Sequence, residues 1–360
     1  MDNTNQEKYL GDLVNNSGTI RDTIEDRRSK GFGIVAEITA ILEEVPLGRY
    51  KLEIGLKLRQ AMLLNAILFN SEAWHSVSEV EIKRLEAVDE HLLRTLVKSH
   101  AKTPLEFLYM EAGATPIRFI ISSRRLIYHQ VILKRDDKEL TKKIYNAQKD
   151  DCTPGDFVDL LAKDFLLIEE HQDDNKIGES NCNSYKKNIK AKLKTAAFKY
   201  MKEAQQTHSK VRQIQYKKLE IQKYMTSPLF SNEEVNLLHA LRSRSTECKE
   251  NFKQKYTNSN LLCNLCKVEN EDQAHLMRCS VIQDNFDTEE IANRQIKYDD
   301  IFSENIVKQK EITSLFIILF KIRNEIQENQ TSQPAPSNTD VMLRTSNNLH
   351  NCIVYLSSGN

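Results

Sequence analysis

Four potential metal ligands near the C-terminal end constrain the fold most, because a shared ion would force their side chains to converge. Cys263, Cys266, His275 and Cys279 have the spacing C-x2-C-x8-H-x3-C. Thiolate and imidazole groups suit tetrahedral zinc, and C-x2-C lets two sulfurs reach one ion from a tight turn. Four protein ligands fill the coordination shell, so the pattern predicts a structural Zn²⁺ site. The alternative is a set of ordinary reduced cysteines beside a surface histidine.

The N-terminal sequence, MDNTNQEKYL, is polar and has no secretory signal. No apolar run approaches the ~20 residues of a membrane span. We therefore expect an intracellular protein without a membrane partner, in which the cysteines stay reduced. Clustered cysteines in such a protein indicate metal binding better than they indicate disulfides.

Most of the chain has the pattern of long helices. Its 360 residues include only 10 glycines and 7 prolines, well below the usual roughly 7% and 5%. Apolar residues recur at i, i+3, i+4 spacing, as between Ile82 and Leu96, and either Ser76 or Ser78 could begin that helix with a capping box. Residues 8–19 instead predict a β-hairpin with its turn at Asn16, Ser17 and Gly18. The fold class we expect is mostly α.

Breaks in periodicity and changes in charge divide the chain into six parts. Residues 171–184 are polar without periodicity and are interpreted as a linker. The sequence TSQPAPSNTD favours disorder at the end. The predicted parts are a hairpin (1–19), a helical bundle (20–134), a helical connection and linker (135–184), a basic helical segment (185–256), a zinc-knuckle unit with a C-terminal helix (257–330) and a disordered tail (331–360).

Positive charge is concentrated in residues 181–223, which contain 12 lysines and arginines and 2 acidic residues in a chain of zero net charge. Lysines neutralise phosphates and release counterions, so this pattern indicates a nucleic-acid partner. Tyr200, Tyr216 and Tyr224 could stack on unpaired bases. The alternative is a solvated helical face with the tyrosines in the core. The candidate contacts are Lys186, Lys187, Lys190, Lys192 and Lys194, and further along the chain Arg242, Arg244 and Lys253.

The order of these segments resembles the C-terminal part of the reverse transcriptase polyprotein of non-LTR (LINE-type) retrotransposons. The likeness runs from about Lys8 to Glu325. KYLGDLV (8–14) resembles the hairpin that follows the polymerase palm and grips the primer. Residues 20–42 and 57–97 resemble the thumb helices, and TPLEFLYMEAGATPIRFIISSRRLIYHQVIL (103–133) is characteristic of one branch of these elements. LRSRSTECKENFKQKY (241–256), followed by the cysteines, is similar to the region after the thumb.

This resemblance implies nucleic-acid binding, to RNA, an RNA–DNA hybrid or single strands. It implies a role for Tyr9, Leu10 and Gly11 in gripping the primer. In a thumb, basic side chains on helices would face the backbone of an A-form-like hybrid. The candidates for that role are Arg27, Arg28, Lys30, Arg124 and Arg125, for which plain surface charge is the alternative.

The chain departs from the family at the polymerase chemistry. That chemistry needs an F/Y-x-D-D motif and an upstream aspartate to hold two metal ions, and KYDD (297–300) lacks the spacer residue. We assign no catalytic residue and expect no activity from this chain alone. We expect a fragment of such a polyprotein, with a separate palm-bearing chain as a further partner. The alternatives are a helical scaffold braced by its metal site and a decayed retroelement remnant without a role.

Overall fold

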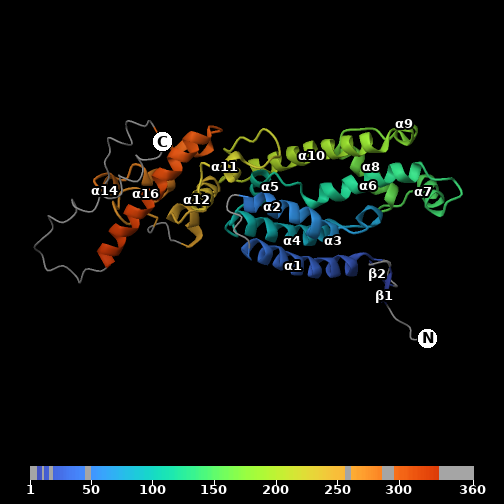
Figure 1. Ribbon diagram of the computed structural model, residues 1–360, viewed down its shortest axis with the longest axis horizontal. Helices are drawn as coiled ribbons and strands as arrows, with labels where there is room; N and C mark the ends of the chain where they lie inside the picture. The colour runs from blue at the N-terminus through green and yellow to red at the C-terminus, as the bar shows by residue number, and fades with distance from the viewer. Residues whose placement is uncertain are drawn as a thin grey trace, which may run out of the picture.

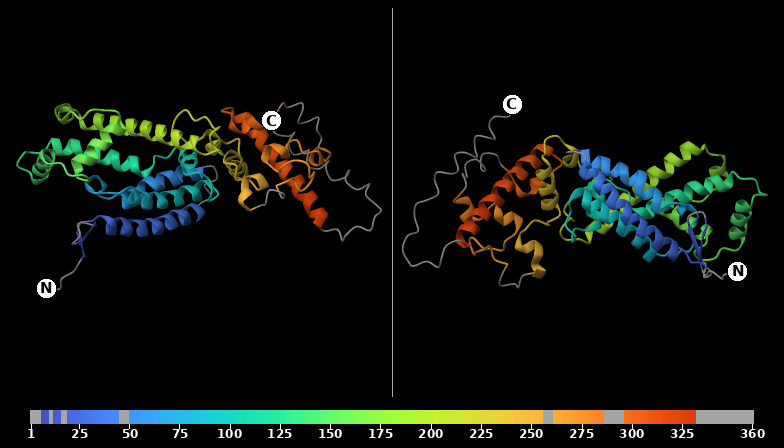
Figure 2. Two further views of the ribbon diagram at one scale, coloured as in Figure 1. Left: turned by 180° about the vertical axis from the view of Figure 1, so that it is seen from behind. Right: turned by 60° about the horizontal axis from the view of Figure 1, so that its bottom comes forward.

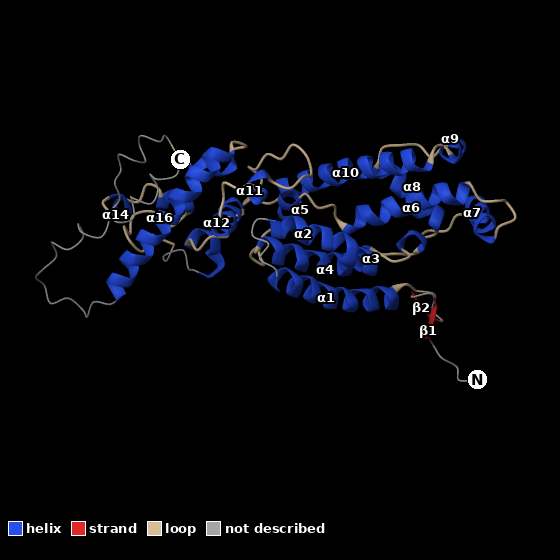
Figure 3. Cartoon of the chain, viewed as in Figure 1, coloured by secondary structure: helices blue, strands red, loops and turns tan. Residues whose placement is uncertain are grey.

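The computed structural model describes residues 6–9, 12–15, 19–44, 50–255, 261–285 and 296–331. The chain is mostly helical, with one antiparallel hairpin at its N-terminal end, which confirms the predicted fold class (Figure 3). The strands are β1 (Gln6–Tyr9) and β2 (Asp12–Asn15).

The helices follow in chain order. They are α1 (Arg21–Glu44), α2 (Lys51–Leu58), the π-helical turn η2 (Arg59–Leu63), α3 (Leu64–Ile67), the short 3₁₀ turn η3 (Ser71–Ala73), α4 (Glu79–Val97), α5 (Leu105–Ala112), α6 (Ile117–Leu133), α7 (Leu140–Asp150), α8 (Phe157–Leu167), α9 (Asp174–Glu179), α10 (Cys182–Gln206), α11 (Lys223–Thr226), α12 (Asn232–Arg242), the 3₁₀ segment η4 (Lys249–Lys255), α13 (Gln273–Leu276), α14 (Ser280–Gln283), the 3₁₀ segment η6 (Tyr298–Phe302) and α16 (Ile306–Thr331).

The molecule is elongated. Helices α1 to α10 fill one half, whereas α12, α14 and α16 lie in the other, with α11 between them (Figure 1). The same separation is visible from behind and from below in Figure 2. Among the described helices, none combines the length and the apolar character needed to cross a membrane.

The hairpin differs from the prediction in the position of its turn. Tyr9 pairs with Asp12, so the chain reverses between these two residues. The predicted turn residues 16–18 follow β2, and they lie outside the described residues, as do Leu10 and Gly11. Thr23 of α1 ties the hairpin to the helices: its Oγ1 accepts from the Leu13 N–H at 2.9 Å and donates to the Leu13 carbonyl at 3.1 Å.

Helix α4 begins at Ser78, which decides between the two predicted caps. The Ser78 hydroxyl accepts from the Glu81 N–H at 3.3 Å, and the Glu81 carboxylate accepts from the Ser78 N–H at 2.7 Å. This is the predicted capping box. Ser76 instead donates its backbone N–H to the Gly155 carbonyl at 2.8 Å, in a left-handed conformation with φ 50°.

The segment interpreted as a linker is a packed part of the fold, so that interpretation is wrong. It contains α9, in which Ile177 is buried and Asp173 caps the N-terminus. Asp174 accepts from Tyr145 at 2.9 Å and from Lys149 at 2.8 Å. A polar sequence without periodicity can therefore be fixed by hydrogen bonds to α7, which sequence patterns do not record.

The basic segment 185–256 is also less helical than predicted. Helix α10 ends at Gln206, and the residues from 207 to 222 form turns and extended chain before the short α11. Helix α10 packs against α5 and α6 through a row of apolar residues, namely Tyr185, Ile189, Leu193, Ala197 and Met201. It therefore belongs to the same core as these helices and is no separate unit.

The C-terminal unit likewise shares a core with the first helices. One cluster of buried apolar side chains continues from Ile20 in front of α1, through Tyr224 of α11 and Leu241 of α12, to Ile322 of α16. The predicted boundaries at 184/185 and 256/257 are therefore not boundaries between hydrophobic cores. Helix α16 ends at Thr331, and the predicted disordered tail from 332 onwards lies outside the described residues.

Tight packing at the end of α5 depends on Gly113. This residue ends the helix with φ 61°, in the left-handed region that favours glycine. A Cβ there would lie 2.3 Å from the backbone of Glu220 and Ile221. The close approach lets the Gln222 N–H donate to the Glu111 carbonyl at 3.0 Å, which joins α5 to the chain leading into α11.

Candidate metal centre and basic surfaces

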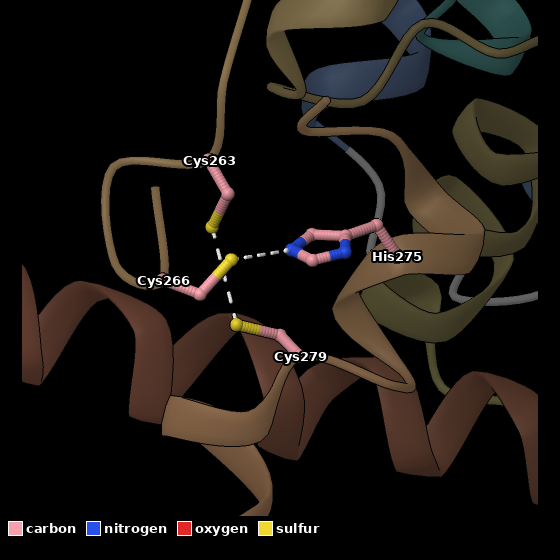
Figure 4. A group of neighbouring side chains, drawn as sticks. All are labelled: Cys263, Cys266, His275 and Cys279. Atoms are coloured by element: carbon pink, nitrogen blue, oxygen red, sulfur yellow. Dashed lines mark hydrogen bonds between the residues drawn. The ribbon is translucent and has the colours of Figure 1, made fainter. Parts of the chain in front are cut away.

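The four predicted metal ligands converge on one point (Figure 4). Their ligand atoms all lie within 4.8 Å of one another. The sulfurs of Cys263 and Cys279 are 4.0 Å apart, and Sγ of Cys266 lies 3.3 Å from Nε2 of His275. This group could hold a metal ion, as the spacing predicts.

Two short structural elements bring these ligands together. Leu262 and Asn270 pair as an antiparallel bridge, and the Cys263 N–H donates to the Glu269 carbonyl at 2.7 Å. The loop between them presents both sulfurs of the C-x2-C pair, with Lys267 in a left-handed conformation (φ 60°). Asp272 then caps α13 by accepting from the His275 N–H at 2.6 Å, which places the imidazole opposite the loop.

A carboxylate orients the histidine. Nδ1 of His275 lies 3.3 Å from Oε2 of Glu269, which also accepts from Arg278 at 3.0 Å. With Nδ1–H donating to this carboxylate, Nε2 presents its lone pair to the centre. Metal-binding histidines in proteins commonly have such an acidic partner.

Burial and backbone donors set the protonation of the thiols. Cys263, Cys279 and His275 are each 1–2% exposed, whereas Cys266 is half-buried. Burial raises the pKa of Cys279 to about 11. Burial would also raise the pKa of Cys266, but hydrogen bonds from the backbone of Glu269 and Val268 outweigh it and lower that pKa to about 7.

A buried ion pair and hydrogen bonds from a buried lysine attach the centre to its surroundings. Glu271 is fully buried and accepts from Arg323 of α16 at 2.7 Å. On the other side, Lys249 donates to the Leu262 carbonyl at 2.8 Å and to Asn264 at 2.7 Å. These contacts span many residues in sequence, and for that reason no local pattern revealed them.

The lysines of α10 lie where the sequence predicts a basic surface. Lys186, Lys187, Lys190 and Lys194 are exposed on α10 and lie outside its apolar row. In the part of the chain that the structure describes, no carboxylate lies within 4.0 Å of these four ammonium groups. Lys192 is half-buried and forms an ion pair with Glu170.

Arg242 is buried, so the prediction that it contacts nucleic acid is wrong. Its guanidinium is 2% exposed and donates to Oε1 of Glu111 at 2.9 and 3.1 Å. Glu111 is fully buried and also accepts from the hydroxyls of Tyr216 and Tyr224 at 2.5 Å each. Burial raises the pKa of both phenols far above its usual value, so these tyrosines are core residues. Only Tyr200 of the three predicted stacking residues is exposed.

The basic residues of α1 that were predicted to contact nucleic acid form ion pairs within the protein. Arg27 is buried and donates to Asp12 at 3.1 Å, and Arg28 pairs with Glu25 at 2.7 Å. Lys30 pairs with Asp26. Arg28 is half-exposed and Lys30 is exposed. Tyr9 is the last residue of β1.

The two arginines of α6 support the fold. Arg125 is 5% exposed and pairs with buried Asp164 of α8 at 2.7 Å. Arg124 donates to the carbonyls of Leu68 and Leu64 at the end of α3, which also accept from the backbone N–H groups of Ser71 and Leu68. The prediction that Arg124 and Arg125 contact phosphates is therefore wrong, and both side chains have structural roles.

Arg244 and Lys253 line a cleft of about 640 Å³ beside the metal centre. This basic cleft is also lined by Lys102 and Lys210, and by Phe252, Asp272 and Tyr298. Sequence analysis missed Lys102, Lys210 and Phe252 as site residues. Lys210 lies in the predicted basic segment, but no local pattern sets it apart there or connects positions 102, 210 and 252.

Comparisons with protein families, with curated proteins and with solved structures found no match to this chain.

Proposed function

We propose that this chain binds nucleic acid, as RNA, an RNA–DNA hybrid or a single strand. The observation that carries the proposal is the row of exposed lysines on α10, which have no carboxylate partner in the described residues. Such a row can neutralise phosphates along a strand, and counterion release then drives binding without sequence preference. A solvated face would instead commonly mix acidic residues with the lysines.

We also propose that the metal is structural zinc. Three thiolates and one imidazole form a common ligand set for Zn²⁺. Zinc–sulfur bonds of about 2.3 Å in a tetrahedron place two sulfurs about 3.8 Å apart, close to the 4.0 Å between Cys263 and Cys279. Four protein ligands leave no open position, so the ion would brace the fold and would not activate water.

In biological terms, the proposal is that the chain acts as the thumb and zinc-knuckle part of a LINE-type reverse transcriptase. The ordered resemblance of its segments supports this, and a separate palm-bearing chain would supply the polymerase site. The rival is a helical scaffold whose metal only braces the core, and the continuous core from α1 to α16 is the observation that favours it.

The lysines of α10 are expected to control the salt dependence of binding. Each phosphate neutralised on a single strand contributes about −0.7 to the slope of log K against log salt. Replacing Lys186, Lys187, Lys190, Lys192 and Lys194 with glutamine should flatten the slope by up to roughly 3.5 and weaken binding similarly for every sequence. Filter binding with RNA, single-stranded DNA and duplex at several salt concentrations measures both effects.

A matched control carries five lysine-to-glutamine changes elsewhere, at Lys57, Lys98, Lys138, Lys143 and Lys163. In both sets one lysine forms an ion pair and four have no carboxylate within 4.0 Å in the described residues. The control should keep the parent's slope. If the α10 variant binds RNA as tightly as the parent with the same slope, the α10 lysines are a solvated face and the scaffold hypothesis is favoured.

The chain alone is expected to show no polymerase activity, because its sequence lacks the F/Y-x-D-D motif. The test supplies an oligo(dT)-primed RNA template, deoxynucleotides and Mg²⁺. Primer extension above a no-protein control would contradict the expectation and require a catalytic metal site elsewhere in the chain.

A further inference from the structure

The basic cleft beside the metal centre has the features of a site for one exposed base. We propose that it binds an unpaired nucleotide of a single-stranded RNA or DNA, with the base stacked on Phe252 and the flanking phosphates held by Lys102, Lys210 and Lys253. This inference rests on the proposed function and adds to it a specific recognition element.

The walls of the cleft come from regions that are far apart in the chain. Lys102 follows α4, Lys210 lies just beyond the end of α10, and Phe252 is in η4. The remaining wall is formed by residues 272–274, at the start of the helix that carries His275. A metal ion held by His275 would therefore fix one side of the cleft.

Positive charge dominates this cleft. Four basic residues and two carboxylates line it, an excess of two positive charges; Lys253 pairs with Oε1 of Glu250, and Asp272 caps α13. Burial and the neighbouring charges of Lys102 and Arg244 lower the pKa of Lys210. An anion bound between these groups would relieve their mutual repulsion.

Phe252 provides an aromatic surface among the cations. The ammonium groups of Lys255 and Lys210 lie 5.2 and 5.8 Å from its ring centre, and the His100 ring meets it edge-on at 5.3 Å. The side chain is half-buried. A phenylalanine held among lysines suits a nucleotide, because the base can stack on the ring while the phosphates meet the charges.

Two polar atoms of cleft-lining residues have no hydrogen-bond partner in the described part of the chain. They are Nε of Arg244 and Oε2 of Glu250, a donor and an acceptor. Buried polar groups are rarely left unpaired. Both atoms are buried, and a base has donors and acceptors on its edge, so a nucleotide that displaces the surrounding side chains could pair with both.

The test compares two strands of equal length, oligo(dT) and an abasic strand that keeps the phosphates and lacks the bases. Fluorescence anisotropy is measured on the full chain with zinc bound. The parent should prefer oligo(dT). Phe252→Leu keeps an apolar side chain without the aromatic face, and it should weaken oligo(dT) binding by roughly 5- to 150-fold. Its affinity for the abasic strand and its salt slope should match the parent's.

Phe252→Trp should preserve the preference for oligo(dT), and its fluorescence should be quenched by oligo(dT) more than by the abasic strand. The one native tryptophan, Trp74, is 3% exposed and gives a constant background. Phe69→Leu is the control, because Phe69 is 51% exposed with Arg27 over its ring at 5.4 Å, outside the cleft. This control should bind both strands like the parent.

Four outcomes overturn the inference. If Phe252→Leu binds oligo(dT) like the parent, nucleic-acid binding stands and the stacking site is wrong. If the Trp variant is not quenched, or if oligoglutamate competes as well as oligo(dT), the cleft does not recognise a base. If the parent binds no nucleic acid at all, the proposed function and this inference both fail.

Discussion

Cys263→Ser is expected to abolish stoichiometric zinc binding and to unfold the region around the metal centre. Cys263 is 1% exposed and its sulfur lies 4.0 Å from that of Cys279, so serine would remove a central ligand. Structural zinc contributes on the order of 10 kcal/mol of folding free energy in isolated small units. Residues 261–285 should lose protection in hydrogen exchange, whereas α1 to α10 should keep theirs.

The matched control for this change is Cys152→Ser, because Cys152 is an exposed free cysteine far from the cluster in sequence. It should leave both zinc content and exchange unchanged. Elemental analysis of protein purified without chelator provides the measurement of zinc. A parent protein without stoichiometric metal would rule out the zinc proposal, and an unchanged exchange pattern in Cys263→Ser would show that the metal does not hold this region.

Glu111→Gln is expected to destabilise the whole chain by about 3–5 kcal/mol, since it leaves the buried Arg242 guanidinium without its counter-charge. Glu111 and Arg242 are 0% and 2% exposed, and they join α5 to α12. Arg242→Met should have an effect of similar size, because it leaves Glu111 with only the two tyrosine hydroxyls. The midpoint and slope of urea unfolding give the free energy.

The double variant shows whether the loss of stability comes from the interaction between Glu111 and Arg242. If Glu111 and Arg242 act together, Glu111→Gln with Arg242→Met should cost clearly less than the sum of the single changes. The exposed pair Arg135 and Glu139 is the control, with side chains 37% and 45% exposed. Breaking it should cost less than about 1 kcal/mol. Equal effects at the two pairs would contradict the role assigned to burial.

Local patterns predicted the features that depend on nearby residues. The metal ligands lie within 17 residues of each other and their spacing alone indicates the site. The capping box at Ser78 needs only four residues. The sequence could not decide between Ser76 and Ser78, because the choice depends on the contact of Ser76 with Gly155.

Distant partners explain the predictions that failed. Arg242 looked like a surface charge because Glu111, which neutralises it, is 131 residues away. Arg125 has its partner Asp164 39 residues away on another helix. The basic cleft stayed hidden for the same reason, since Lys102, Lys210 and Phe252 meet only in the folded chain. Charge in a sequence therefore predicts an exposed basic surface best where it repeats along one helix, as on α10.

The buried carboxylate of Glu111 has a consequence for how the chain is made. A ribosome adding about 5–20 residues per second needs roughly 7–26 s to proceed from Glu111 to Arg242, 131 residues later. Throughout that time the nascent chain contains an acidic group without the arginine that neutralises it in the finished protein. Water must hydrate that carboxylate until then, so the buried site at the end of α5 cannot close before Arg242 has been made. This part of the core therefore closes only after α12 emerges.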